Sequence, residues 1–226
     1  MPTICNDNES EIRLIEKIKK FKKLLKFQSF ILLARPKDIV YTCEEAKKKF
    51  IQDLTLIVEK GLLILEIPWF DNENWLDLMS DLRSKFPYLL IGSASLINKK
   101  SIDDSLKLDL NFSMMRTWNK DLFTYSKINN YLLIPGMTSI KDLKEAISYK
   151  CSMIKIFPIA NKDILLNINK YNHISFVGAG DIAINDINKF KSLGYRGVVV
   201  GSKGYDGEKF DPKIFELLNI KRQQYK

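Results

Sequence analysis

Short apolar runs alternate with amphipathic stretches along most of this chain, and this alternation constrains the fold more than any other feature. The runs are rich in Ile, Leu and Val and lie at 30–35, 62–68, 88–94, 110–115, 131–136, 152–158, 173–180 and 195–202. Such continuous apolar character is typical of strands that are covered on both faces of a parallel sheet. Helices are predicted between and after them, at 42–60, 72–86, 97–108, 117–128, 139–149, 161–171, 186–194 and 212–224. The helix at 42–60 is expected to begin with a capping box of Thr42 and Glu45 and to end at Gly61.

Eight strands that alternate with helices at this spacing predict an α/β protein, a (β/α)8 TIM barrel. An open, doubly wound sheet is the competing arrangement, but no G-x-G-x-x-G fingerprint follows the first strand. The chain contains neither an evident linker nor a low-complexity segment. We therefore predict one barrel domain over residues 1–226, in which residues 1–28 form an N-terminal helical extension.

The N-terminal helix is predicted at 9–27, where apolar residues recur at helical spacing and lysines occupy the other face. The apolar stripe consists of Ile12, Ile15, Ile18, Phe21 and Leu25. The formal net charge of +9 leaves open a nucleic-acid-binding protein that uses this basic helix. However, the lysines are scattered along the whole chain, and the stripe is better suited to cover the barrel bottom or a subunit contact. We expect no nucleic-acid partner.

Cysteine and histidine usage disfavours several kinds of site. Cys5, Cys43 and Cys151 are far apart and lack the spacing of metal ligands or of a disulfide framework. The single histidine, His173, is expected at a strand edge or in a loop, so a zinc site or a His-dependent triad is not expected. No apolar run is long enough to span a bilayer, and the polar, acidic start is not typical of a secretory signal. We expect a cytoplasmic protein without membrane partner, metal or cofactor.

In barrels of this kind the active site forms at the C-terminal ends of the strands. The polar or otherwise unusual residues there are Arg35, Glu66, Ser93, Ser95, Arg116, Pro135, Gly136, Lys155, Gly178, Gly180, Gly201 and Ser202. Glu66 and Lys155 are each flanked by apolar residues, and burying a charge is costly. A salt bridge between them across the lumen is one interpretation. The other is that burial depresses the pKa of Lys155, which then acts as a nucleophile toward a carbonyl carbon, with Glu66 moving protons.

Small residues end the last two strands, in "FVGAGDI" and "VVVGSKGY". Loops at these positions of a barrel often bind phosphate through backbone N–H groups, which glycines allow to approach closely. Turn glycines at strand–helix junctions are the plainer interpretation. Because two such loops occur together, we favour phosphate binding.

Several segments resemble the 2-keto-3-deoxy-6-phosphogluconate and 4-hydroxy-2-oxoglutarate aldolase family. "IKIFP" is similar to the K-[FI]-F-P motif that carries the Schiff-base lysine of the family, and "LEIPW" is similar to its E-[VI]-[TP]-L motif. "LLAR", "IGSASL", "IPGMTSIKDL" and "VGSKGY" resemble the motifs of the first, third, fifth and last strands. The resemblance extends from about Phe30 to Gly204.

This resemblance implies a class I aldolase that cleaves a 2-keto-3-deoxy sugar acid, or 4-hydroxy-2-oxoglutarate, to pyruvate and an aldehyde. Lys155 would form the pyruvate imine and Glu66 would be the general acid/base. The implied substrate-binding residues are Arg35, Ser95, Pro135, Gly136, Gly180, Gly201 and Ser202. The resemblance also implies a homotrimer that requires no metal.

The sequence departs from the family pattern around the substrate. Phe70 stands where some members carry a carboxylate-binding arginine, and "SMMR" replaces the strand-four motif and introduces Arg116. Asp181 stands at the position of a phosphate-binding glycine, where a carboxylate would repel phosphate. The pattern indicates a changed substrate, less phosphorylated than usual. The alternative is a divergent paralogue with weak or no aldolase activity that binds an anionic metabolite.

Overall fold

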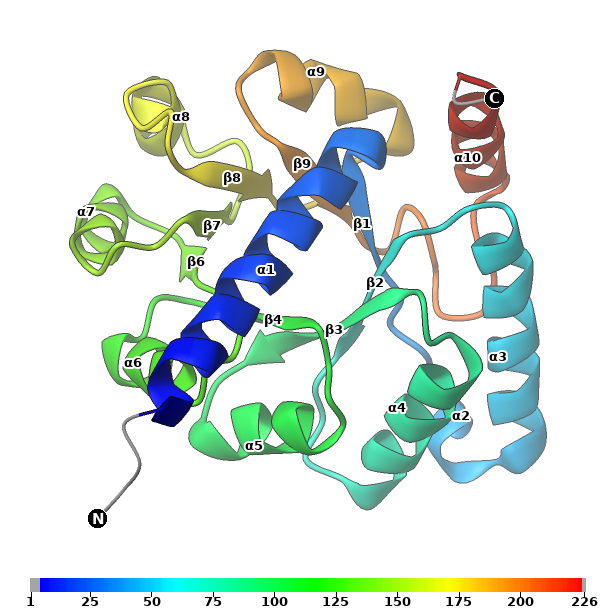
Figure 1. Cartoon of the computed structure of the whole chain (residues 1–226). Coiled ribbons are helices and arrows are strands. Elements are labelled where there is room, and N and C mark those ends of the chain that lie inside the picture. The colour runs from blue at the N-terminus through cyan, green and yellow to red at the C-terminus, as the bar shows by residue number, and fades with distance from the viewer. Residues whose placement is uncertain (1–4, 225–226) are drawn as a thin grey trace.

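The chain forms one parallel β-sheet surrounded by helices in a computed structural model that describes residues 5–224 (Figure 1). The strands are β1 (Phe30–Leu33), β2 (Ile64–Pro68), β3 (Leu90–Leu96), β4 (Phe112–Met115), β5 (Leu133–Ile134), β6 (Gly136–Met137), β7 (Met153–Ile156), β8 (Ser175–Gly178) and β9 (Gly197–Val200). The helices are α1 (Cys5–Phe27), α2 (Ile39–Thr42), α3 (Glu44–Glu59), α4 (Glu73–Lys85), α5 (Lys99–Lys107), α6 (Lys120–Ile128), α7 (Ile140–Ser148), α8 (Lys162–Ile168), η1 (Ile184–Asp186, a 3₁₀ turn), α9 (Ile187–Ser192) and α10 (Pro212–Gln224). Within residues 5–224, no helix is long and apolar enough to cross a membrane.

Pro135 closes the barrel. The sheet order is β5-β4-β3-β2-β1-β9-β8-β7-β6, so β5 and β6 are its two edges. These edges are adjacent in the chain and separated only by Pro135, which has no N–H to donate to a ladder. The Pro135 carbonyl still accepts a hydrogen bond of 2.9 Å from the Lys155 backbone. Residues 133–137 therefore act as one strand, and the nine segments make eight strand positions, which confirms the predicted (β/α)8 barrel.

The strands divide their side chains between two apolar clusters, as the period of two requires. Leu65, Ile154 and their equivalents face the helices, whereas Ile64, Phe112 and Met153 belong to a second cluster that fills the lumen. Gly92 leaves room for the ring of Phe112, because a Cβ at this position would lie 2.5 Å from the ring. The lumen is therefore a packed apolar core below the strand ends.

Helix α1 covers the N-terminal end of the barrel, as its apolar stripe predicts (Figure 1). The rings of Phe21 and Phe112 meet edge to face at 4.6 Å between centroids, and Leu25 packs close to Gly197. The prediction holds only for the second half of the stripe, since Ile12 and Ile15 are 54% and 43% exposed. Residues 1–4 of the predicted extension, together with 225–226, lie outside the described residues.

The expected capping box at Thr42 is wrong. Thr42 ends the short helix α2, and its hydroxyl group donates to the carbonyl of Asp38. Cys43 has extended backbone angles and breaks the helix there, so that α3 begins at Glu44 without a side-chain cap. The predicted end is correct, because Gly61 follows α3 with a φ of 105°.

A chain of buried hydroxyl groups lies between the sheet and α5. Ser93 Oγ is 2.8 Å from Ser105 Oγ and 2.5 Å from Ser113 Oγ, and Ser113 Oγ is 2.7 Å from Tyr131 Oη. These four side chains are buried, and each has a hydrogen-bond partner in the group. Ser93, a strand-end candidate, therefore belongs to the outer face of the sheet.

Truncation of Phe21 tests the role of α1. We expect Phe21→Ala to lower the free energy of unfolding by about 3–5 kcal/mol, because a fully buried aromatic ring is lost from the barrel floor. Urea unfolding followed by circular dichroism measures this. Ile12→Ala, on the same helix but exposed, is the control and should change the value by no more than about 0.5 kcal/mol. Equal effects of the two substitutions would contradict the assignment.

Candidate active site

A cavity of about 570 Å³ opens at the C-terminal ends of the strands. Seven of the predicted site residues line it: Arg35, Glu66, Ser95, Lys155, Gly180, Gly201 and Ser202. They come from six different strand positions around the barrel, far apart in the sequence. The eightfold arrangement therefore brings together most of the residues that the sequence singled out.

Lys155 lies on the lumen side of β7, between apolar residues below and the cavity above. Its amine donates a hydrogen bond of 2.5 Å to the carbonyl of Met115, at the end of β4. Burial lowers the pKa of Lys155, the charge of Arg116 lowers it further, and the charge of Glu66 opposes both. A larger fraction of the amine is thus unprotonated at a given pH than for an exposed lysine.

Glu66 lies on β2 and is only 2% exposed. Burial raises the pKa of its carboxyl group from 4.5 to about 7, against the opposing charges of Lys155 and Arg35. Its Oε1 atom has no hydrogen-bond partner among the described residues. A carboxyl group with a pKa near neutrality can both take up and release a proton at physiological pH.

Glu66 and Lys155 do not form the salt bridge that one interpretation of the sequence expects. In the described part of the chain, no ion pair within 4.0 Å joins them, and the amine is directed to the Met115 carbonyl instead. The two groups line the same cavity without neutralising each other.

Pro135 and Gly136 are not among the residues that line the cavity. Leu133 and Met137, two residues before and after Pro135, belong to the helix-facing apolar cluster. Gly136 lies against the end of β4, where a Cβ would be 2.7 Å from the Met115 carbonyl oxygen and 2.5 Å from that of Arg116. Since the Met115 carbonyl accepts the hydrogen bond of Lys155, Gly136 positions the lysine indirectly.

Ser95 reaches the cavity through an irregularity near the end of β3. The pairing of β3 with β4 shifts register between Ser93 and Leu96, and Ser95 has a φ of 63°. A left-handed backbone is unusual for serine and commonly marks a bulge or a functional position. The bulge exposes the Ser95 side chain at the cavity wall.

The cavity also contains residues that the sequence analysis did not include in the site. Arg116 lines it from the end of β4. The sequence indicated that Arg116 lies at a strand end but did not place it among the substrate-binding residues. Lys203, Tyr205 and Asp206 line it from the segment after β9. They follow the predicted Ser202 directly, so extending the strand-end search by a few residues would have found them.

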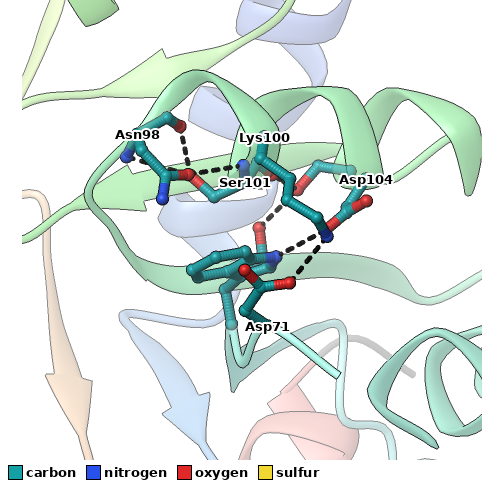
Figure 2. Close-up of polar contacts among 8 residues, drawn as sticks. Asp71, Asn98, Lys100, Ser101 and Asp104 are labelled. Atoms are coloured by element: carbon teal, nitrogen blue, oxygen red, sulfur yellow. Dashed lines mark hydrogen bonds and ion pairs between the residues drawn. The ribbon is translucent and has the colours of Figure 1, made fainter. Parts of the chain in front are cut away.

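The connection after β2 is held in place by polar contacts (Figure 2). The Lys100 amine lies 2.8 Å from Asp71 and 3.0 Å from Asp104, and Asp104 also accepts a hydrogen bond from the indole of Trp69. Phe70, which stands where some members of the resembled family carry an arginine, does not line the cavity. Its ring packs on that of Tyr41, with 5.9 Å between the ring centroids. The cavity therefore has no cation from this connection.

A search of the described residues finds no group of three or more His, Cys, Asp or Glu side chains arranged to hold a metal ion. His173 lies in the turn before β8, exposed and against Tyr171, in agreement with its predicted loop position.

Comparison with protein families identifies the barrel. The family model described as "Aldolase: KDPG and KHG aldolase" matches residues 37–213, most of the chain. The chain belongs to the KDPG and KHG aldolase family. A comparison with the curated proteins gives no match.

Solved structures share the barrel of this family member at low sequence identity. KDPG aldolase from Zymomonas mobilis ZM4, solved with 3-phosphoglycerate, is 18% identical and has a TM-score of 0.70, over 88% of this chain and 93% of that one. KDPG aldolase from Legionella pneumophila, with pyruvate captured as a covalent carbinolamine, is 18% identical and has a TM-score of 0.67, over 86% of this chain and 93% of that one. Thiamine phosphate pyrophosphorylase from Pyrococcus furiosus is also similar, with 15% identity and a TM-score of 0.64, over 89% and 98%. At these identities the likeness shows the fold alone.

The raised pKa of Glu66 predicts a pH-dependent cost in stability. The folded state holds the proton up to a pH of about 7, whereas the unfolded state releases it near 4.5, so the free energy of unfolding falls as pH rises through this window. Glu66→Gln lacks this effect. The difference in the free energy of unfolding between Glu66→Gln and the native chain should therefore shift by about 3 kcal/mol in favour of the variant between pH ~4 and pH ~8.

Denaturant titrations of both proteins at the two pH values measure this difference. Glu16→Gln, at an exposed position of α1, is the matched control and should parallel the native chain. A Glu66→Gln difference that is independent of pH would show that the carboxyl group is not held protonated by burial.

Gly136→Ala tests the close approach between β6 and β4. The added methyl group meets backbone oxygens that cannot rotate away, so we expect a loss of about 1–3 kcal/mol in the free energy of unfolding. Gly201→Ala meets only a Leu33 methyl group at 3.6 Å and should cost less. If the two substitutions had the same effect on thermal unfolding, the tight contact would not be a constraint.

Proposed function

We propose that the protein is a class I aldolase that cleaves a 2-keto-3-deoxy sugar acid to pyruvate and an aldehyde through a Schiff base on Lys155. One observation carries the proposal: a buried amine with a lowered pKa shares a cavity with a carboxyl group whose pKa is about 7. Membership in the KDPG and KHG aldolase family supports the same chemistry.

The first step forms the imine. The neutral Lys155 amine attacks the C2 carbonyl carbon, the new C–N bond forms, and the carbonyl oxygen takes up a proton to give a carbinolamine. Loss of the hydroxyl group as water, with a proton delivered by Glu66, leaves the iminium ion. The Met115 carbonyl, at 2.5 Å, holds the amine in place before attack.

The second step breaks the C3–C4 bond. The Glu66 carboxylate removes the proton of the C4 hydroxyl group, the aldehyde leaves, and the electron pair of the broken bond passes to the iminium as an enamine. Protonation of the enamine carbon and attack by water then release pyruvate and regenerate the amine. A group with a pKa of about 7 suits both directions of this proton transfer.

The remaining cavity residues bind the substrate in this proposal. Arg35, which follows β1, and Arg116, at the end of β4, bring the positive charge that attracts the carboxylate of the keto acid. The Ser95 hydroxyl group hydrogen-bonds the pyruvyl part. Gly180, Gly201 and Ser202 line the wall after β8 and β9, and in this proposal they lie next to the aldehyde-derived half. We also propose a cytoplasmic homotrimer, as the family resemblance implies, which sedimentation equilibrium can test.

Borohydride trapping tests the proposal directly. Incubation with pyruvate and borohydride should attach one reduced pyruvate to Lys155, detected by intact mass and peptide mapping, because reduction of the imine gives a stable secondary amine. The adduct should form at lower pH than with an ordinary lysine, since burial lowers the pKa of Lys155.

Two variants frame this experiment. Lys155→Met should give no adduct, whereas Lys162→Met, at an exposed lysine on α8, should be labelled like the native chain. A folded native protein that remains unlabelled near neutral pH would refute the aldolase proposal, and so would labelling that persists in Lys155→Met.

A further inference from the structure

We propose that the enzyme acts on a keto acid whose aldehyde-derived half bears hydroxyl groups but no phosphate, and that Asp181 is the residue that excludes phosphate. This inference rests on the proposed aldolase function and specifies its substrate class. It comes from the distribution of charge around the cavity and from the state of the backbone amides at the β8–β9 side.

Charged side chains of both signs line the cavity. Arg116 lines it from the end of β4, and Arg35 lines it from the segment after β1, which pairs with β9. Asp181 lines it from the segment after β8, the strand that pairs with β7, and Asp206 and Lys203 line it from the segment after β9. An anionic group that approaches the β8 side of the cavity is therefore opposed by Asp181.

Lys203 does not offer a free positive charge to a phosphate. Its amine lies 3.7 Å from the Asp181 carboxylate, and both side chains are largely exposed, at 55% and 77%. A phosphate near Lys203 would have to approach Asp181 as well, and like charges at short range repel. The pair thus cancels the cation that the rim of the cavity would otherwise present.

Carboxylates of the chain itself occupy backbone amides that could hold an anion here. Asp206 Oδ1 accepts hydrogen bonds of 2.9 Å from the amides of both Glu208 and Lys209, which hold its pKa below the usual range. Asp211 accepts a bond of 2.8 Å from the amide of Lys213 in the first turn of α10. After β8, only the 3₁₀ turn η1 and the six-residue α9 follow, too short to form an anion-binding helix end.

The charge balance fits one carboxylate. Arg35, Arg116 and Lys203 bring three lasting positive charges to the cavity, and Asp181 and Asp206 bring two negative ones, so a single positive charge remains. The carboxylate of the keto acid neutralises it. A second, doubly charged phosphate would leave the filled cavity with uncompensated negative charge.

The test compares two aldehydes in the pyruvate-dependent aldol reaction, D-glyceraldehyde and D-glyceraldehyde 3-phosphate, by kcat/KM. The native enzyme should prefer the unphosphorylated aldehyde. Asp181→Asn removes the carboxylate and releases Lys203, so the ratio of the two kcat/KM values should shift toward the phosphorylated aldehyde on the order of tenfold. Asp186→Asn removes the same charge from the same connection outside the cavity lining and should leave the ratio unchanged.

Borohydride trapping with pyruvate, on the same preparations, separates the two levels of the proposal. If Lys155 is labelled but the native enzyme prefers the phosphorylated aldehyde, accepts neither, or shows no shift in Asp181→Asn, the inference is overturned and the aldolase function stands. A preference for phosphate that depends on Lys209 and Lys213, which line an adjoining cavity of about 340 Å³, would overturn it in the same way. If Lys155 is not labelled in folded protein, the aldolase function fails and this inference falls with it.

Discussion

The exclusion of water from the barrel lumen is the constraint on which the rest of this structure depends. Ile64, Phe112 and Met153 fill the lumen, and Phe21 of α1 closes it from the N-terminal side. Glu66 and Lys155 lie on top of this apolar core, so burial is the largest influence on both of their pKa values. The packing that stabilises the barrel is thus the same packing that raises the pKa of Glu66 and lowers that of Lys155.

The geometry of the lysine depends on contacts between neighbouring strands. Pro135 divides one strand into two segments and still accepts the backbone hydrogen bond of Lys155. Gly136 lets the end of β4 approach closely enough for the Met115 carbonyl to receive the amine. A residue outside the cavity lining therefore constrains the position of the Lys155 amine.

The centre of the cavity follows the motifs that resemble the KDPG and KHG aldolase family, to which the chain belongs, whereas the rim departs from them. Lys155 and Glu66, in the segments that resemble family motifs, both line the cavity at the top of the lumen. The rim differs, since Phe70 packs on Tyr41, Arg116 enters from β4, and Asp181 pairs with Lys203. Rim residues lie on exposed connections that the apolar core does not constrain, so they can change while the barrel and the two buried ionisable groups remain.

The sequence by itself determined the barrel, the order of its strands and helices, and the two candidate reactive groups. It could do so because apolar periodicity depends on local burial, and because a charge inside an apolar run is conspicuous without coordinates. The start of α3 was not predicted correctly. The extended backbone of Cys43 separates α2 from α3, and side-chain capping patterns do not report such a break. Only the tertiary structure decided what Lys155 touches, that Glu66 Oε1 has no hydrogen-bond partner among the described residues, and that Ser93, Ser113 and Tyr131 share hydrogen bonds. Those contacts join residues from different strands, and their distances depend on register, a bulge and the absence of a single Cβ, none of which periodicity encodes.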